Sequence, residues 1–432
     1  MMRPVSYLTR KPSTKVMNMN FQTADDRFAA FRHRSYTLFF FARFLAAFAT
    51  QIISVSVGWQ MYDETKSAWF LGLIGLVQFL PSLLLFLVTG TITDRYNRRR
   101  IVSICLIVSA LCSAALLFVT IADLFSPLLV FGILTVFGIE RAFMGPAVQS
   151  LAPNLVPEKD LPNSFAWNAS SWQTASITGP VAGGLLYGLG PVWAYSVALA
   201  FMTAGAVLVL FIPKPAQRTA SEPKSLAYVL AGFKFIRSEK VVLGAISLDL
   251  FAVLLGGAVA LMPIFASEIL VLGPLGLGLL RAAPGIGAIA MALYLASFPI
   301  RHHSGAIMFI GVGIFGLATL VFGLSDTTWL SIAALIVMGA GDMISVYVRE
   351  TLIALWTPDQ VRGRVNAVNM VFIGASNELG EFRAGSMASI VGAVPAVVIG
   401  GIGTLLVSIA WAGMFPSLRK IDTLDAPESS AR

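Results

Sequence analysis

Twelve long, predominantly apolar stretches limit what this chain of 432 residues can fold into. Each is about as long as the roughly 20 residues that an α-helix needs to cross a bilayer. Backbone groups inside a bilayer must bond internally, so only helices and closed barrels can span it. Runs of this length predict an all-α membrane protein with twelve transmembrane helices. The predicted spans are residues 36–62, 68–93, 99–121, 127–150, 164–190, 191–213, 240–263, 274–300, 304–325, 327–350, 364–391 and 393–415.

The composition excludes several functional classes. Charged residues make up 12% of the chain, whereas soluble domains carry about 25%. The sequence contains no GxxxxGKS or GxxxxGKT motif for ATP and no cluster of cysteine and histidine. Cys105 and Cys112 lie seven residues apart in one apolar run, which favours core packing over a disulfide or a metal site. We therefore expect no enzyme, no cofactor and no metal.

Lysine and arginine are distributed unevenly between the two sides of the predicted membrane protein. If the N-terminus is cytoplasmic, the tails and loops on that side hold 25 of the 30 basic residues. The other side holds Lys66 alone. Cytoplasmic loops collect such residues, so both termini are predicted to be cytoplasmic. The net charge of +8 then reflects topology rather than nucleic-acid binding.

The longest predicted loop divides the chain into two sets of six spans. The expected organisation is a cytoplasmic tail 1–34, a half 35–213, a linker 214–239, a second half 240–415 and a tail 416–432. The linker also predicts an amphipathic helix on the inner leaflet, and binding of a soluble partner is the less favoured alternative. Its apolar face would carry Leu226, Val229, Leu230, Phe233 and Ile236.

The two halves repeat each other at an offset of 201 residues. The aligned pairs include Gly138 with Gly339, Asn168 with Asn369, and Gly184 with Gly385. The register continues without a gap through spans 4 and 5 and spans 10 and 11. Two like-oriented halves joined by a central loop are typical of transporters that bind substrate near the midplane, between the halves.

Three motifs resemble those of the major facilitator superfamily. GTITDRYNRRR (90–100) resembles the loop between helices 2 and 3, with Asn97 in place of the usual glycine. Arg141 followed by Gly145 resembles a motif of helix 4. TGPVAGG (178–184) resembles the end of a helix 5 motif seen in exporters and antiporters, although the upstream glycines are missing. Within the superfamily, the likeness is to the branch of enterobactin exporters and drug efflux proteins, and it rests on ARF (42–44), SLDLFAVLLGGAVALMPIFA (247–266), LRAAPGIGA (280–288), RGRVNAVN (362–369) and SNELGEFRAG (376–385).

The resemblance implies a conformational latch in the first motif. Asp94 would face the cytoplasmic start of span 11, where unpaired N–H groups and the helix dipole favour a negative charge. The motif residues that match are Gly90, Asp94, Arg95, Arg98 and Arg99. We expect Asn97 to adopt a left-handed turn conformation, which asparagine tolerates. The corresponding loop ASFPIRHHSGA (296–306) contains no aspartate, so the latch would be one-sided. The alternative is a basic loop with an incidental aspartate.

Charged residues inside the spans cost roughly 2.5–3.5 kcal/mol each and therefore point to function. Glu378 and Glu381 lie three residues apart on one helical face. Two close carboxylates in a low dielectric resist ionising together, so one can hold a proton. The alternative is that they pair with arginines and fix helix packing. The further candidates for proton coupling are Arg43, Arg141, Asp249 and Arg383.

Polar and aromatic residues inside the spans are candidates for a substrate cavity. They are Gln51, Trp172 and Gln173, and an apolar pocket with few polar groups suits an amphipathic organic ligand. Gly179 and Pro180 are expected to kink span 5, and Gly183 and Gly184 to allow close helix approach. Simple close packing is an equally favoured interpretation of these four residues.

These observations predict a secondary transporter in the bacterial plasma membrane, which exports a small organic molecule by proton antiport. Its partners would be the substrate, protons and the lipid bilayer, and we expect a monomer. The residues leave open a siderophore exporter, a metabolite importer, and a membrane scaffold or sensor that transports nothing.

Overall fold

The computed structural model describes residues 27–213 and 226–425, and these contain helices and no β-strand. This confirms the predicted all-α class. The helices of the first half are α1 (Arg34–Thr65), α2 (Ala68–Arg95), α3 (Arg98–Ile121), α4 (Pro127–Leu151), α5 (Leu161–Leu189) and α6 (Pro191–Leu210). Those of the second half are α8 (Lys240–Gly256), α9 (Met262–Ile264), α10 (Gly273–Ser297), α11 (Ser304–Leu324), α12 (Thr328–Trp356), α13 (Asp359–Val391) and α14 (Ala393–Met414).

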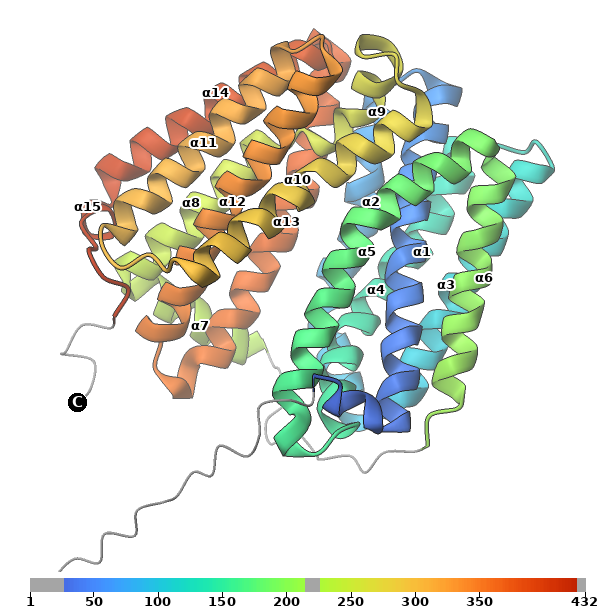
Figure 1. Ribbon diagram of the computed structural model, residues 1–432, viewed down its shortest axis with the longest axis horizontal. Helices are drawn as coiled ribbons and strands as arrows, with labels where there is room; N and C mark the ends of the chain where they lie inside the picture. The colour runs from blue at the N-terminus through green and yellow to red at the C-terminus, as the bar shows by residue number, and fades with distance from the viewer. Residues whose placement is uncertain (1–26, 214–225, 426–432) are drawn as a thin grey trace, which may run out of the picture.

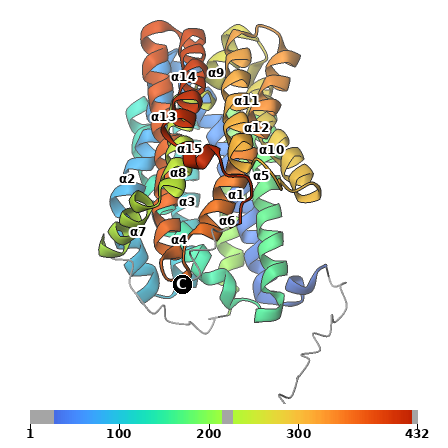
Figure 2. The same cartoon turned by 90° about the vertical axis from the view of Figure 1, so that its left-hand side faces the viewer.

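Ten of the described helices are long and apolar enough to cross a membrane by length and composition. The long helices outside that set are α5 and α13, which correspond to each other in the sequence repeat. Both pack against the other half of the molecule, α5 against α10 and α13 against α2. Figure 2 shows these two pairs on opposite flanks of the molecule.

The repeat is visible in equivalent glycine contacts. A Cβ added at Gly184 of α5 would lie 2.4 Å from the carbonyl oxygen of Pro274 in α10. One added at the aligned Gly385 of α13 would lie 2.5 Å from the Cα atom of Gly72 in α2. The fifth span of each half, α5 or α13, therefore packs on the second span of the other half, α10 or α2, at a distance that leaves no room for a side chain.

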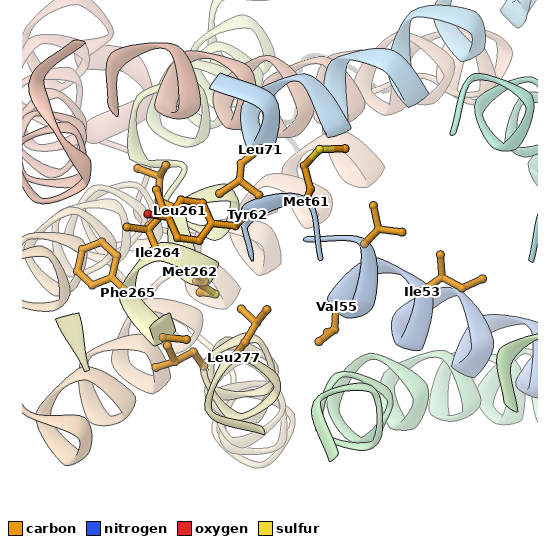
Figure 3. Close-up of a cluster of buried hydrophobic side chains, with 14 of the residues drawn as sticks. Ile53, Val55, Met61, Tyr62, Leu71, Leu261, Met262, Ile264, Phe265 and Leu277 are labelled. Carbon is orange, nitrogen blue, oxygen red and sulfur yellow. The ribbon is translucent and has the colours of Figure 1, made fainter. Parts of the chain in front are cut away.

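The two bundles meet at one end only. We call the end where α1 begins at Arg34 the terminal end, and the end where α1 finishes at Thr65 the opposite end. Figure 1 shows the bundles converging at the opposite end and diverging toward the terminal end. At the opposite end, one apolar cluster joins both halves. It brings Tyr62 and Leu71 together with Leu261 and Ile264 (Figure 3).

The glycine contacts at the opposite end give a testable expectation. Gly184→Val should cost about 1–3 kcal/mol of contact energy between the halves, because its side chain would overlap the backbone at Pro274. We expect transport to fall strongly and the opposite end to open. Gly188→Val, one turn later in α5, is the matched control, since no atom lies within 4 Å of a Cβ there. Equal transport by the two variants would contradict the expectation.

The first helix of the second half is interrupted. α8 ends at Gly256, and the chain continues through the short turns η4 (Val259–Leu261), α9 and the π-helical η5 (Phe265–Ile269). Arg383 of α13 hydrogen-bonds to two carbonyls in the last turn of α8. Its Nε donates to the carbonyl of Leu254 at 3.0 Å, and its Nη2 donates to that of Leu255 at 2.5 Å. A cation at the C-terminal end of a helix is stabilising, and Arg383 thereby ties α13 to α8.

Helix α7 (Leu226–Ser238) begins within the predicted linker, and its first four side chains lie outside the described residues, including Leu226 and Val229. The remainder packs on α13. Ile236 is fully buried, and a Cβ at Gly232 would lie 2.4 Å from the backbone oxygen of Arg364. Leu230 and Phe233 are exposed. The helix therefore docks by one face and leaves apolar side chains on another.

The described part of the C-terminal tail folds back on the second half. The backbone amides of His303 and Ser304 donate to the Asp422 carboxylate and carbonyl, at 2.9 and 3.0 Å. The pKa of Asp422 is lowered by the hydrogen bond from His302 and by this backbone donor. Leu418 is fully buried, so residues 416–425 form part of the folded unit.

Candidate functional site

The carboxylates of Glu378 and Glu381 lie together on α13, where it meets α2. A Cβ added at Gly75 of α2 would be 2.6 Å from Oε2 of Glu378 and 3.0 Å from Oε2 of Glu381. The missing side chain at Gly75 is what makes room for both groups. Sequence reasoning identified the pair, but it did not identify Gly75, because nothing in the sequence pairs α2 with α13.

Arg141 reaches across the interface between the halves. Its Nη1 atom on α4 lies 3.1 Å from Oε1 of Glu378 on α13. The side chain of Arg141 is 64% exposed, whereas that of Glu378 is 15% exposed. The Arg141 end of the ion pair is therefore accessible from outside the protein. The pair links the two halves through the carboxylate of Glu378, which can take up a proton.

A second arginine approaches the carboxylates from α10. Nη1 of Arg281 donates to the hydroxyl of Ser54 on α1 at 2.6 Å, which is another contact between the halves. Arg281 also interacts electrostatically with Glu381. Arg281 was not among the candidates for proton coupling from the sequence. Its position instead adds it to the group formed by Glu378, Glu381 and Arg141.

Asp249 belongs to a different cluster, inside the second half. Its carboxylate on α8 pairs with the guanidinium of Arg349 on α12, and both residues are buried. Nε of Arg349 also lies 3.5 Å from Oε1 of Glu350, which accepts a hydrogen bond from Asn369 at 3.0 Å. The count of 25 cytoplasmic basic residues included Arg349 as a residue that flanks a loop, but Arg349 lies within α12, which continues to Trp356.

The other cavity candidates lie on α1 and α5. Gln51 of α1 packs against Gly179, where an added Cβ would be 2.6 Å from the Cβ of Gln51. Gly183 contacts the same helix at Ile52. Pro180 lies within an unbroken α5, and these contacts favour close packing for the motif. Trp172 is 49% exposed.

The residues of the predicted latch tie the first half together. Arg98 donates to the carbonyl of Ser150 at the end of α4, and Arg99 to that of Leu210 at the end of α6. Arg95 is exposed, and Gly90 lies buried within α2. The side chain of Asp94 is outside the part of the chain that the structure describes, so its partner remains a prediction.

The expectation for Asn97 was wrong. Its φ of −65° is not left-handed. Asn97 is instead the N-cap of α3, and its side-chain oxygen accepts a hydrogen bond from the backbone amide of Arg100 at 3.3 Å. Asparagine is among the preferred N-cap residues, which explains its presence where the superfamily has glycine.

The comparison with protein families decides the identity of this bundle. A family model described as transmembrane secretion effector, within the major facilitator superfamily, matches residues 25–431. The chain belongs to this family. Membership assigns a transport function, rather than that of an enzyme, a scaffold or a sensor.

Individual relatives agree with the family. The enterobactin exporter EntS of Citrobacter koseri is 27% identical over 90% of this chain and 93% of its own length. That of Shigella boydii is 26% identical over the same shares. Among solved structures, a bacterial homologue of the lysosomal transporter Spinster, inward-facing and occupied, aligns with a TM-score of 0.71 at 15% identity, covering 90% and 97% of the two chains. The nucleoside transporter NupG aligns with a TM-score of 0.67 at 13% identity, covering 88% and 100%. Both share the major facilitator fold.

Proposed function

We propose that this protein exports a small organic molecule by proton antiport with alternating access. The observation that carries the proposal is the carboxylate pair Glu378–Glu381, held between the halves with Arg141 on Glu378. Ionisable groups inside a membrane bundle mark proton and substrate paths, because burying them for packing alone is costly.

The coupling step follows from the geometry of this group. An ionised Glu378 holds Arg141 and so links α4 to α13. A proton on Glu378 removes its charge and weakens the link, because a neutral acid attracts a guanidinium far less than a carboxylate does. The nearby Glu381 favours that proton, since two close carboxylates repel each other. Proton binding would thus bias the relative position of the halves.

The direction of transport rests on the assigned topology. Lysine and arginine lie mainly at the terminal end, and removing Arg349 from the count leaves this bias intact. The terminal end is then cytoplasmic, in a bacterial inner membrane, and the conformation described is inward-facing. Export is supported by the curated relatives, which are named as exporters.

Purified protein in liposomes tests this function. Enterobactin, named for the relatives, is the first compound to assay, followed by a panel of drugs and metabolites. With a pH gradient imposed, at least one compound should move uphill and carry protons in the opposite direction. A gradient-independent substrate flux, or no proton movement with any transported compound, would reject antiport.

A further inference from the structure

Five arginines of the described structure lie seven or more residues from both ends of a long helix, and four of them have a partner there. They are Arg141 on Glu378, Arg281 on Ser54, Arg349 on Asp249, and Arg383 on the carbonyls of Leu254 and Leu255. The fifth is Arg43 of α1. No hydrogen bond or ion pair joins Arg43 to any described residue, and its one electrostatic neighbour there is the Tyr36 phenol.

Arg43 lies on the face of α1 that looks toward the other half. Ser54 is eleven residues later, close to three turns of an α-helix, so the two side chains point in nearly the same direction. Ser54 contacts Arg281 of α10, and both Ser54 and Thr50 are exposed. The neighbouring Ala42 faces another direction, since its carbonyl lies against Gly205 of α6.

Arg43 and Arg141 stand at similar depths. Arg43 is nine residues from the start of α1 and Arg141 ten residues from the end of α4, both counted from the terminal end. At a rise of 1.5 Å per residue, each lies about 14–15 Å inside. The bundles diverge toward this end (Figure 1), and Arg141 is largely exposed. Two cations thus lie at similar depth on α1 and α4.

One exposed aromatic side chain, that of Trp172, lies on the helix next to α1. Trp172 precedes Gly179 by seven residues, or two turns of α5, and so shares the face that packs on α1. α5 runs parallel to α1 from the terminal end, and Gly179 is level with Gln51. Trp172 is therefore level with the stretch of α1 that carries Arg43, and half of its surface is exposed.

We propose that Arg43 binds an acidic group of the transported molecule, which makes the substrate class an amphipathic organic acid. A cation at this depth costs roughly 2.5–3.5 kcal/mol without a partner. A planar guanidinium is suited to bidentate binding of a carboxylate. Arg141 is held by Glu378, which leaves Arg43 as the cation able to receive the anion, with Trp172 beside the apolar body.

This substrate class rests on the proposed transport function, but its test needs no gradient. Protein in nanodiscs is titrated with matched pairs of an acid and its amide, such as 1-naphthoate with 1-naphthamide and indole-3-acetate with indole-3-acetamide. At least one acid should bind about tenfold more tightly than its amide, as expected for a charge-assisted hydrogen bond.

Variants assign the preference to Arg43. Arg43→Gln should weaken binding of the acid by about tenfold and leave binding of the amide unchanged. Unchanged binding of the amide also shows that the variant is folded. Arg43→Lys should keep most of the preference. Arg301→Gln removes one charge from an exposed loop residue and should change neither affinity. No acid-selective binding in the panel, or a preference that survives in Arg43→Gln, would overturn the proposal.

The two proposals can fail separately. Acid binding through Arg43 without proton movement in liposomes would reject antiport and keep the substrate class. Proton-coupled transport without an acid preference that depends on Arg43 would reject the substrate class and keep antiport.

Discussion

Uphill transport is expected to fall to background when Glu378 or Glu381 is replaced by glutamine, while exchange of substrate down its own gradient continues. Glutamine keeps the shape of glutamate and can neither release nor take up the proton. The Arg141 contact would lose its charge in Glu378→Gln, which mimics the protonated state permanently. Accumulation against a gradient and exchange between equal concentrations, both measured in liposomes, separate the two activities.

A structural role for the same residues predicts a different pattern. If Glu378 only fixed packing through Arg141, Glu378→Gln would lower thermal stability and exchange together. The double variant Glu378→Gln with Arg141→Gln would then recover both, since no charge is left without a partner. Asp63→Asn is the matched control, because Asp63 pairs with Lys66 at 2.8 Å on the exposed surface. Uphill transport that survives in both Glu378→Gln and Glu381→Gln would reject the coupling role.

The helices were predictable from the sequence because bilayer thickness and backbone bonding leave few alternatives. The repeat at an offset of 201 residues was equally informative. It aligned Gly184 with Gly385, and the structure places these two residues in equivalent contacts between the halves. It also relates α5 to α13, the two long helices that lie outside the set of ten apolar ones.

Partners across the interface were not predictable. Arg141 and Glu378 are 237 residues apart, and no local pattern joins them. Asp249 and Arg349 are likewise 100 residues apart, on α8 and α12, and no local pattern joins them. Asn97 carried a usable signal: an asparagine before a helical run is an N-cap pattern, and it was interpreted as a turn residue instead.

The buried pair of Asp249 and Arg349 should dominate the stability of the second half. Asp249→Asn leaves a buried guanidinium whose nearest remaining carboxylate, that of Glu350, lies 3.5 Å from its Nε. Breaking a buried ion pair on one side costs about 3–5 kcal/mol, because the desolvated charge loses its partner. Chemical unfolding in detergent should show a loss of this size for Asp249→Asn and for Arg349→Met.

Removing both charges together should restore most of that loss. Asp249→Leu with Arg349→Met fills a similar volume with apolar atoms, and such replacements are often neutral or stabilising. Transport by the double variant then decides what the pair is for. Recovery of stability together with proton-coupled transport would assign Asp249 to packing and leave coupling to Glu378 and Glu381. Recovery of stability without coupled transport would assign the Asp249–Arg349 pair to transport rather than to packing, since the fold would be intact and only these two charged groups missing.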